Sequence, residues 1–199
     1  MSRKVKEDTS ISKTLSWLLR HGAVKEGLTI GSDGFVDVSE ILQHKSLRGR
    51  CNIEDIERIV ADNKKQRFTL RTEPHLQIRA NQGHSIPVVT DLELTTIEQT
   101  DDLVVIHGTY YRNWNSIKCN GLSRMNRQHI HFSPGELGDA QVVSGMRSSC
   151  QIYIYVDVHQ ALADGIKFYR SSNNVILSPG DSRGYIGTKY FTKVVDVTS

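Results

Sequence analysis

The sequence has no apolar stretch long enough to cross a membrane, since its longest hydrophobic run, at 152–156, covers only five positions. A run of that length is typical of a buried strand, whereas a membrane-spanning helix needs roughly 20 apolar residues. The first residues also lack the apolar core of a secretory signal. We therefore expect no membrane association and a location in the cytoplasm, the nucleus or both.

Cysteine is scarce: Cys51, Cys119 and Cys150 are the 3 cysteines of the chain, and they are far apart. An odd number at such spacing indicates neither a disulfide framework nor a zinc site, and it favours a reducing compartment. His129 and His131 are separated by one residue, but no third ligand follows at a suitable distance in the sequence. The sequence thus predicts no bound metal.

Two glycine-rich nucleotide motifs are also missing. The chain contains neither a P-loop nor the Gly-x-Gly-x-x-Gly fingerprint of dinucleotide-binding folds. The hydrophobic content of 38% and charged content of 24% are nevertheless ordinary for a globular protein of 199 residues. Any nucleotide would have to be held by another kind of site.

Charge is unevenly distributed although the net charge is only +3. Residues 1–88 carry 15 Lys and Arg against 11 Asp and Glu, and residues 103–199 carry 10 against 6. Between them, residues 89–102 carry five acids and no base. Two basic lobes joined by an acidic linker suggest a polyanionic partner, although solvated surfaces and an acidic linker would produce the same pattern.

The first half reads as three short helices followed by a β-hairpin. Ser10 or Ser12 is expected to cap the first helix, whose apolar face carries Ile11, Leu15, Leu18 and Leu19 and which ends near Gly22. Extended segments at 67–70 and 75–78 form the predicted hairpin around a turn at Glu73-Pro74. This order favours a winged-helix-like lobe. Basic residues beside the hairpin are expected to contact RNA, and they are Lys64, Lys65 and Arg67.

The second half is dominated by strands without regular helix alternation, which favours a sandwich-like sheet. A buried strand at 103–106 is expected to deliver His107, Gly108 and Thr109 at its end. The segment 129–133 alternates, so that His129, His131 and Ser133 should share one face of a strand. We also expect Trp17 and Trp114 to lie in the core.

Three arginines are placed to hold an anion. Arg79 lies at the mouth of a polar turn within 78–85, Arg20 precedes His21 at the end of the first helix, and Arg147 follows a glycine in the segment 144–148. An arginine fork meets phosphate oxygens two at a time. We expect these arginines and His21 to converge on one phosphate, and we expect Arg79 to contribute little packing.

Together these segments resemble the tRNA 2′-phosphotransferase family over about residues 10–195. The resemblance rests on a series of motifs: Leu-Arg-His-Gly at 19–22, Asp-Gly-Phe-Val at 33–36, Lys-Gln-Arg-Phe at 65–68, Ile-Arg-Ala-Asn-Gln-Gly-His at 78–84, His-Gly-Thr at 107–109, His-Ile-His-Phe-Ser at 129–133, Gly-Met-Arg at 145–147, Ala-Asp-Gly at 163–165 and Asn-x-Val-Ile-Leu at 173–177. Each motif alone is weak, but the complete ordered set would rarely arise by chance.

The resemblance implies an α+β fold with two lobes. A winged-helix lobe that binds RNA and phosphate, residues 1–88, would be joined through the acidic linker 89–102 to an ADP-ribosyltransferase-like split β-sandwich that binds NAD, residues 103–199. The family's catalytic set falls on Arg20, His21, Arg79 and Arg147. Its NAD contacts fall on His107, Gly108, Thr109, His131 and Ser133.

In the family, the 2′-phosphate of RNA attacks C1″ of the NAD ribose and expels nicotinamide. The ribose O2″ then attacks the phosphorus, which releases RNA with a 2′-OH and ADP-ribose 1″,2″-cyclic phosphate. Enzymes that ADP-ribosylate proteins commonly rely on a strand-borne Glu, yet residues 103–199 contain only Glu136, in a Pro-Gly loop. The expected partners are therefore 2′-phosphorylated RNA from tRNA splicing and NAD as co-substrate, with the chain acting as a monomer.

Other functions stay open at this point. An ADP-ribosyltransferase acting on terminal phosphates of RNA or DNA would keep the NAD site without the cyclising step. A non-catalytic winged-helix protein would bind nucleic acid without NAD. Arg79 and Arg147 could equally be surface ion-pair partners, and His107 could be a strand-end histidine with a purely structural role.

Overall fold

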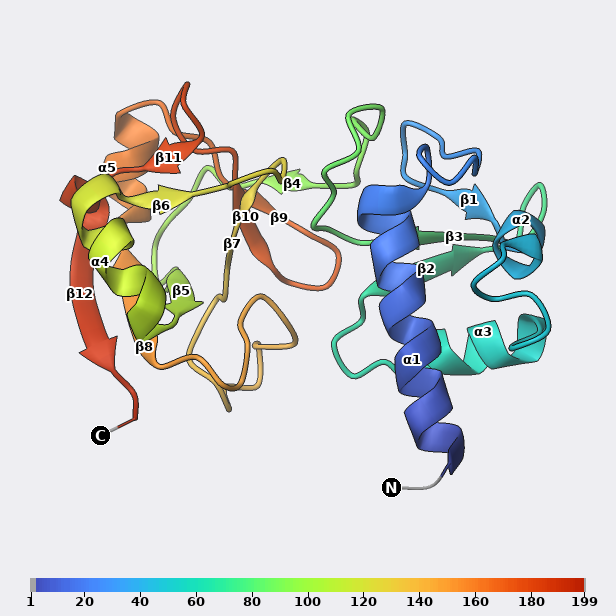
Figure 1. The fold of residues 1–199 in the computed structure, drawn as a ribbon. Coiled ribbons are helices and arrows are strands. Elements are labelled where there is room, and N and C mark those ends of the chain that lie inside the picture. Colours follow the sequence, from blue (N-terminus) through green and yellow to red (C-terminus); the bar gives the residue numbers. More distant parts are fainter. Residues whose placement is uncertain (1–2, 199) are drawn as a thin grey trace. The chain divides into compact units, whose positions relative to one another are not determined.

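The computed structural model describes residues 3–198 and divides into two compact units between Glu93 and Leu94 (Figure 1). The predicted acidic linker at 89–102 is shared between these units. Val89 is buried in the core of the first unit, and Ile97 is buried in the core of the second. Within residues 3–198, no helix has both the length and the apolar content needed to span a membrane.

The first unit contains three α-helices and a small antiparallel sheet. In chain order its elements are α1 (Arg3–Trp17), the π-helical turn η1 (Leu18–Gly22), β1 (Val36–Asp37), α2 (Val38–Gln43), α3 (Ile53–Ala61), β2 (Phe68–Arg71) and β3 (Gln77–Ala80). The strands lie in the order β1-β3-β2, so that the hairpin β2–β3 receives β1 on its outer edge. The helices and the hairpin follow each other as predicted, and the identification as a winged helix stays a prediction.

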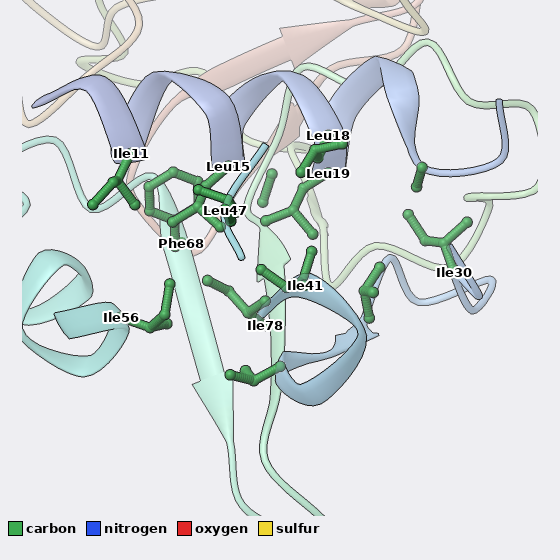
Figure 2. Packing of buried hydrophobic residues seen from close by; sticks show 14 of the residues in the cluster. Ile11, Leu15, Leu18, Leu19, Ile30, Ile41, Leu47, Ile56, Phe68 and Ile78 are labelled. Atoms are coloured by element: carbon green, nitrogen blue, oxygen red, sulfur yellow. The ribbon is translucent and has the colours of Figure 1, made fainter. Parts of the chain in front are cut away.

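The core of the first unit lies between α1, the other helices and the sheet (Figure 2). Its largest fully buried side chains include Ile11, Leu15, Leu18, Leu19, Ile41, Leu47, Ile56 and Ile78. The four apolar residues predicted on the first helix are all in this core. Because they are spaced three and four positions apart, they share one face of the helix and can pack together.

Two predictions for α1 are wrong. The helix begins at Arg3, so Ser10 and Ser12 lie inside it and cap nothing. Straight-chain residues such as Lys4, Lys6 and Glu7 are good helix formers, and the helix therefore extends upstream of the apolar face. Trp17 is 45% exposed rather than buried, and its ring covers Gly22, where an added Cβ would lie only 2.5 Å from it.

The second unit is built from short antiparallel strands and short helices. Its elements are β4 (Thr95–Thr96), β5 (Ile106–Thr109), α4 (Tyr111–Asn120), β6 (Leu122–Ser123), β7 (Ile130–Phe132), β8 (Ile152–Val156), α5 (Val158–Ala163), β9 (Tyr169–Arg170), β10 (Ile176–Ser178), β11 (Tyr185–Ile186), the 3-10 turn η2 (Thr188–Tyr190) and β12 (Phe191–Asp196). The sheets have the orders β4-β9-β10-β7, β12-β8-β5 and β11-β6. Fully buried side chains such as Phe132, Phe168 and Leu122 form its core.

The strand predicted at 103–106 is shifted along the sequence. β5 starts at Ile106, so His107, Gly108 and Thr109 lie inside the strand rather than after it. They face Ile154, Tyr153 and Ile152 of β8 in register. Pairing with the central strand β8 determines where β5 starts and ends. The apolar run before His107 gave no sign of that pairing. A bridge between Ile106 and Ser133 then joins β5 to the end of β7.

Candidate functional site

Arg20 and His21 lie on the turn that ends the first helix. In η1, Leu18 and Leu19 are fully buried, so the two basic residues that follow are turned toward the surface. Arg20 is half-buried and His21 is exposed. A bond from the Ala23 amide to the Leu18 carbonyl, 2.8 Å long, closes this wider helical turn. The core packing therefore determines where the two predicted catalytic side chains emerge.

The segment at 82–85 closes around these two residues. Arg20 Nη2 donates to Gln82 Oε1 at 3.1 Å, and His21 Nδ1 lies 2.8 Å from Ser85 Oγ. The Ser85 amide donates to the Arg20 carbonyl at 2.9 Å. Gly83 has a φ of +92°, and a Cβ there would approach Arg20 Nε to 3.3 Å. The structure thus brings together two of the three segments that the sequence predicted to converge.

The sequence predicted no role for Gln82 or Ser85, although both lie in the stretch 78–85 that carries Arg79. Their amide and hydroxyl groups fix the orientation of Arg20 and His21. The signal that could have found them is their place in the same motif as Arg79. Positioning by neutral hydrogen-bonding partners leaves the positive charge of the arginine available to an anion.

Arg79 lies inside β3, opposite Thr69, and its side chain is enclosed. The residue is only 3% exposed, with its guanidinium carbon 4.8 Å from the ring centre of Phe35. Nη2 lies 2.7 Å from Glu93 Oε2, and Nε has no hydrogen-bond partner among the described residues. Arg79 is the second-last residue of β3 and precedes the bend at 81–82, as predicted. The prediction that it contributes little packing is wrong, because its side chain is buried against Phe35.

In the second unit, His107 and His131 are joined across β5 and β7. His107 Nδ1 lies 2.9 Å from the His131 carbonyl oxygen, which can only accept, so Nδ1 carries the proton. Burial lowers the pKa of His107, and the bond to the carbonyl opposes that effect only in part. The ring is therefore neutral near pH 7, with Nε2 as an acceptor. Its edge contact with Phe132, 5.9 Å between ring centres, also holds it in place.

Gly108 and Thr109 have clear structural roles in β5. A Cβ at Gly108 would lie 2.4 Å from Met146 and 2.9 Å from Cys150 Sγ, so the glycine lets the segment that carries Arg147 pack on the strand. Thr109 is buried, and its carbonyl accepts from the Gln151 amide at 2.8 Å. These contacts connect β5 to Arg147.

Arg147 differs from Arg79 because it is exposed. Its carbonyl accepts from the Cys150 amide at 3.1 Å, which forms a tight turn. Tyr110 Oη lies 2.9 Å from Ser149 Oγ, and hydrogen bonds from Ser149 first and Arg147 second lower the pKa of Tyr110. Gly145, with a φ of +101°, packs against the Phe132 carbonyl, where a Cβ would come within 2.5 Å. The Arg147 loop is thus fixed at its base, while the guanidinium group lies exposed at the surface and hydrogen-bonds to Tyr110.

Of the three residues predicted to share one face, only His131 lies inside β7, and their common face stays a prediction. His131 is half-buried, whereas Ser133 is fully buried and its Oγ has no hydrogen-bond partner among residues 3–198. His129 makes an edge contact with Tyr169 at 5.9 Å between ring centres. Burial first, and the charge of Arg124 second, lower the pKa of His129 to about 4.

The residues predicted to bind RNA lie on the turn before β2. Lys64 is exposed, and Lys65 and Arg67 are half-buried. Arg67 Nη1 lies 3.4 Å from Asn63 Oδ1, and burial lowers the pKa of Arg67. In the part of the chain that the structure describes, no group of three His, Cys, Asp or Glu side chains could hold a metal ion.

The four predicted catalytic residues therefore fall into two groups. Arg20, His21 and Arg79 belong to the first unit, and Arg147 belongs to the second together with the residues predicted to bind NAD. Each group includes basic side chains that can contact a phosphate. The second also offers acceptor and hydroxyl groups that suit a ribose and an amide, namely those of His107 and Ser133.

Comparison with known proteins gives a consistent result. The family model described as RNA 2′-phosphotransferase, Tpt1 / KptA family, matches residues 6–180. A tRNA 2′-phosphotransferase 1 of Danio rerio is 52% identical over 192 residues, covering 94% of this chain and 84% of that protein. The human tRNA 2′-phosphotransferase 1 is 46% identical over 200 residues, covering 98% and 78%. The tRNA 2′-phosphotransferase of Saccharomyces cerevisiae is 44% identical over 185 residues, covering 88% and 80%. With such identities over most of both sequences, this chain belongs to the RNA 2′-phosphotransferase family.

Proposed function

We propose that this chain removes the 2′-phosphate left on tRNA by splicing and transfers it to NAD. The products would be RNA with a 2′-OH, nicotinamide and ADP-ribose 1″,2″-cyclic phosphate. The observation that carries the proposal is the joint fixing of Arg20 and His21 by Gln82 and Ser85 in a chain of this family. Such an arrangement suits a phosphate that must be held in one orientation.

The chemistry requires positioning more than activation. The second pKa of a phosphate monoester is roughly 6, so the 2′-phosphate is already a dianionic nucleophile near pH 7. Arginine side chains can hold it at roughly 3–3.5 Å from its target and neutralise the charge that builds on its oxygens. His21 can hold the phosphate or protonate the departing RNA ribose oxygen.

The second unit supplies groups that fit NAD. The neutral His107 ring presents Nε2 as an acceptor, and Thr109, His131 and Ser133 lie on β5 or beside it. NAD would supply the ribose carbon at which nicotinamide leaves, while these residues orient that ribose and shield it from water. Gly108 would allow the close approach of the Arg147 segment. Small antiparallel sheets without helix alternation support the ADP-ribosyltransferase-like description of this unit, and the helices with the hairpin support the winged-helix description of the first.

Incubation with NAD and an oligonucleotide that carries one internal 2′-phosphate tests the proposal. We expect release of nicotinamide, formation of the cyclic phosphate and a plain 2′-OH. The same oligonucleotide without the 2′-phosphate is the control. Transfer of ADP-ribose to a terminal phosphate, with no cyclic product, would favour the first alternative. RNA binding that is indifferent to NAD and to the 2′-phosphate would favour a non-catalytic binder.

We further propose that the reaction needs no divalent metal, because the arginines perform the charge stabilisation that Mg²⁺ provides in other phosphoryl-transfer enzymes. Turnover should be unchanged in excess EDTA, and its loss and recovery with Mg²⁺ would contradict this. Lys64, Lys65 and Arg67 would add non-specific contacts to RNA, measurable as a weaker salt dependence of RNA binding in their alanine variants. We place the activity in the cytoplasm or nucleus and expect a monomer.

A further inference from the structure

A second group of arginines lies on the turn between β6 and β7, drawn in yellow (Figure 1). Arg124 Nη1 donates to the Arg127 carbonyl at 2.7 Å, and the Arg127 amide donates to the Arg124 carbonyl at 3.1 Å. Met125 between them has a φ of +54°. The Arg124 amide donates to the Gly184 carbonyl at 3.0 Å, and a Cβ at Gly184 would lie 2.6 Å from Arg124 Nε. The turn is therefore fixed by its own hydrogen bonds, and both arginines on it are exposed.

Within the part of the chain that the structure describes, neither Arg124 nor Arg127 forms an ion pair. Among the ion pairs of residues 3–198, none joins Arg124, Arg127 or Arg147 to a carboxylate. Other basic side chains of the same unit are paired: Arg183 lies 3.2 Å from Asp181, and Lys189 lies 2.6 Å from Asp164. Burial first, and the charge of Arg147 second, lower the pKa of Arg127, although part of its side chain is exposed. Positive charges thus accumulate here without an internal counterion.

The turn that carries Arg124 and Arg127 directly precedes β7, and β7 carries His131, one of the residues proposed to bind NAD. Arg127 is four residues before His131 on the same chain segment, so the two Cα atoms are at most roughly 13 Å apart. In NAD, the nicotinamide ribose is joined to the diphosphate through a single methylene group. If His107, His131 and Ser133 hold that ribose, the diphosphate lies within reach of a long side chain just upstream of β7.

We propose that Arg124 and Arg127 bind the diphosphate of NAD. The inference rests on the proposed function and specifies which groups of this chain recognise the dinucleotide. It also has a consequence for the reaction, because the dianionic 2′-phosphate must approach a substrate that already carries two negative charges. Arg127 would reduce that repulsion by neutralising the diphosphate. Two guanidinium groups match its two charges and can each donate paired hydrogen bonds.

Binding of ADP-ribose to the full chain, measured by calorimetry, tests the proposal directly. Arg127→Ala should raise the Kd for ADP-ribose by about 10- to 100-fold, as expected for the loss of a charge-assisted hydrogen bond. Arg127→Lys should recover only part of the affinity, because the ammonium group lacks the planar fork. Arg183→Ala is the matched control: it removes one charge from the same unit, but this arginine is already paired with Asp181. Its Kd should equal that of the wild type.

Thermal unfolding of each variant by circular dichroism shows whether the turn remains folded, and Arg127→Lys keeps the proposal testable if the alanine variant is unstable. An unchanged Kd for ADP-ribose in both Arg127 variants would overturn the inference. An increase confined to the KM for 2′-phosphorylated RNA would also overturn it and assign these arginines to an RNA phosphate. If the wild type itself did not bind ADP-ribose, the use of NAD would fail, and the inference would fail with it.

Discussion

The two units hold their basic residues in different ways. In the first unit, each predicted catalytic side chain already has a partner: Arg20 contacts Gln82, His21 contacts Ser85 and Arg79 contacts Glu93. In the second unit, Arg147 is exposed, and the described residues offer it no carboxylate. The first unit is thus organised before any substrate binds, whereas the second carries positive charge that an anionic substrate can neutralise.

This difference has energetic consequences. A side chain fixed by hydrogen bonds loses little conformational entropy when it contacts a ligand. Exposed arginines lose more, but the mutual repulsion of their charges is relieved when phosphate groups arrive. We therefore expect changes in the first unit to affect both orientation and stability. Changes in the second unit should act mainly on steps in which negative charge develops or binds.

The largest effect is expected for Arg79→Ala. Loss of the guanidinium group should lower turnover by roughly 10²–10³-fold. Because Arg79 is 3% exposed and packs on Phe35, its truncation should also lower the free energy of unfolding by roughly 1–3 kcal/mol. Urea unfolding and single-turnover kinetics measure the two effects separately.

Arg71→Ala is the matched control for Arg79. Arg71 lies over the same Phe35 ring, at 4.0 Å, and pairs with Asp33 at 2.8 Å. Its removal should cost some stability without affecting the reaction. If Arg79→Ala retained wild-type turnover, or if Arg71→Ala lost it, the assignment of Arg79 to the phosphate would be wrong.

Arg147→Ala should have a large effect on rate and almost none on stability. Attack of O2″ on phosphorus builds negative charge on the phosphate oxygens, whereas attack on C1″ develops positive character on the sugar. Removing one donor typically costs roughly 10²–10³-fold in the step where the charge develops. ADP-ribosylated RNA should therefore accumulate during a single turnover, and Arg147→Lys should restore the second step only in part.

A gel time course with radiolabelled 2′-phosphorylated RNA makes this measurement. If Arg147 merely binds RNA, both steps will slow together and no intermediate will appear. Because the side chain is exposed, the melting temperature should remain that of the wild type. A clear loss of stability would mean that Arg147 resembles Arg79 more than the structure indicates.

The sequence predicted the parts of the fold that depend on local pattern. The apolar face of α1 and the order of three helices followed by a β-hairpin are both confirmed. The convergence of Arg20 and His21 with the segment 78–85 was also predicted, because their basic side chains were expected to hold one phosphate, and the contacts with Gln82 and Ser85 agree with it. For the apolar face of α1, spacing along the chain determines position in space.

Other features depend on distant contacts and could not be predicted. The burial of Arg79 follows from the hairpin register, in which Ala80 faces Phe68. The position of His107 inside β5 follows from pairing with β8. The strands β4, β6 and β11 have two residues each, too few to show any alternation. Register and edge pairing are determined by the partner strand, so the sequence of one strand does not reveal them.

The second unit should also respond to mild acid through His129. Its pKa of about 4 in the folded chain lies below the ordinary value of 6.5, because of burial and then the charge of Arg124. Between pH 6.5 and about 4, the unfolded chain takes up a proton that the folded chain does not. The contribution of neutral His129 to the free energy of unfolding is therefore fully present above pH 6.5. It is lost as the pH falls through this range, by at most about 3.5 kcal/mol.

His129→Gln should reduce this part of the pH dependence. The free energy of unfolding, measured in urea at pH 7 and pH 5, should differ less between the two pH values in the variant than in the wild type. His159→Gln, on the exposed face of α5, is a control for the loss of one histidine. Equal pH dependence in wild type and His129→Gln would mean that Arg124 and its surroundings do not hold His129 neutral.

The smallest effect is expected for Ser85→Ala. Ser85 Oγ lies 2.8 Å from His21 Nδ1, and a hydrogen bond of this kind contributes roughly 0.5–1.5 kcal/mol. Its loss should let the imidazole rotate and lower kcat by roughly 2- to 10-fold, while the KM for NAD remains unchanged. Thr192→Ala is the matched change in the second unit, since Thr192 Oγ1 donates to the Tyr155 carbonyl oxygen at 3.4 Å and contacts no group of the proposed reaction. The kcat of that variant should stay within a factor of about 2 of the wild type, because the lost bond is of the same modest kind and holds no reacting group.

Steady-state kinetics of both variants therefore compare one hydroxyl that positions a catalytic group with one that does not. Equal kcat values in the two variants would show that His21 is not held by Ser85. The contrast between the preorganised catalytic residues of the first unit and the exposed Arg147 of the second would then rest on Arg20 and Arg79 alone.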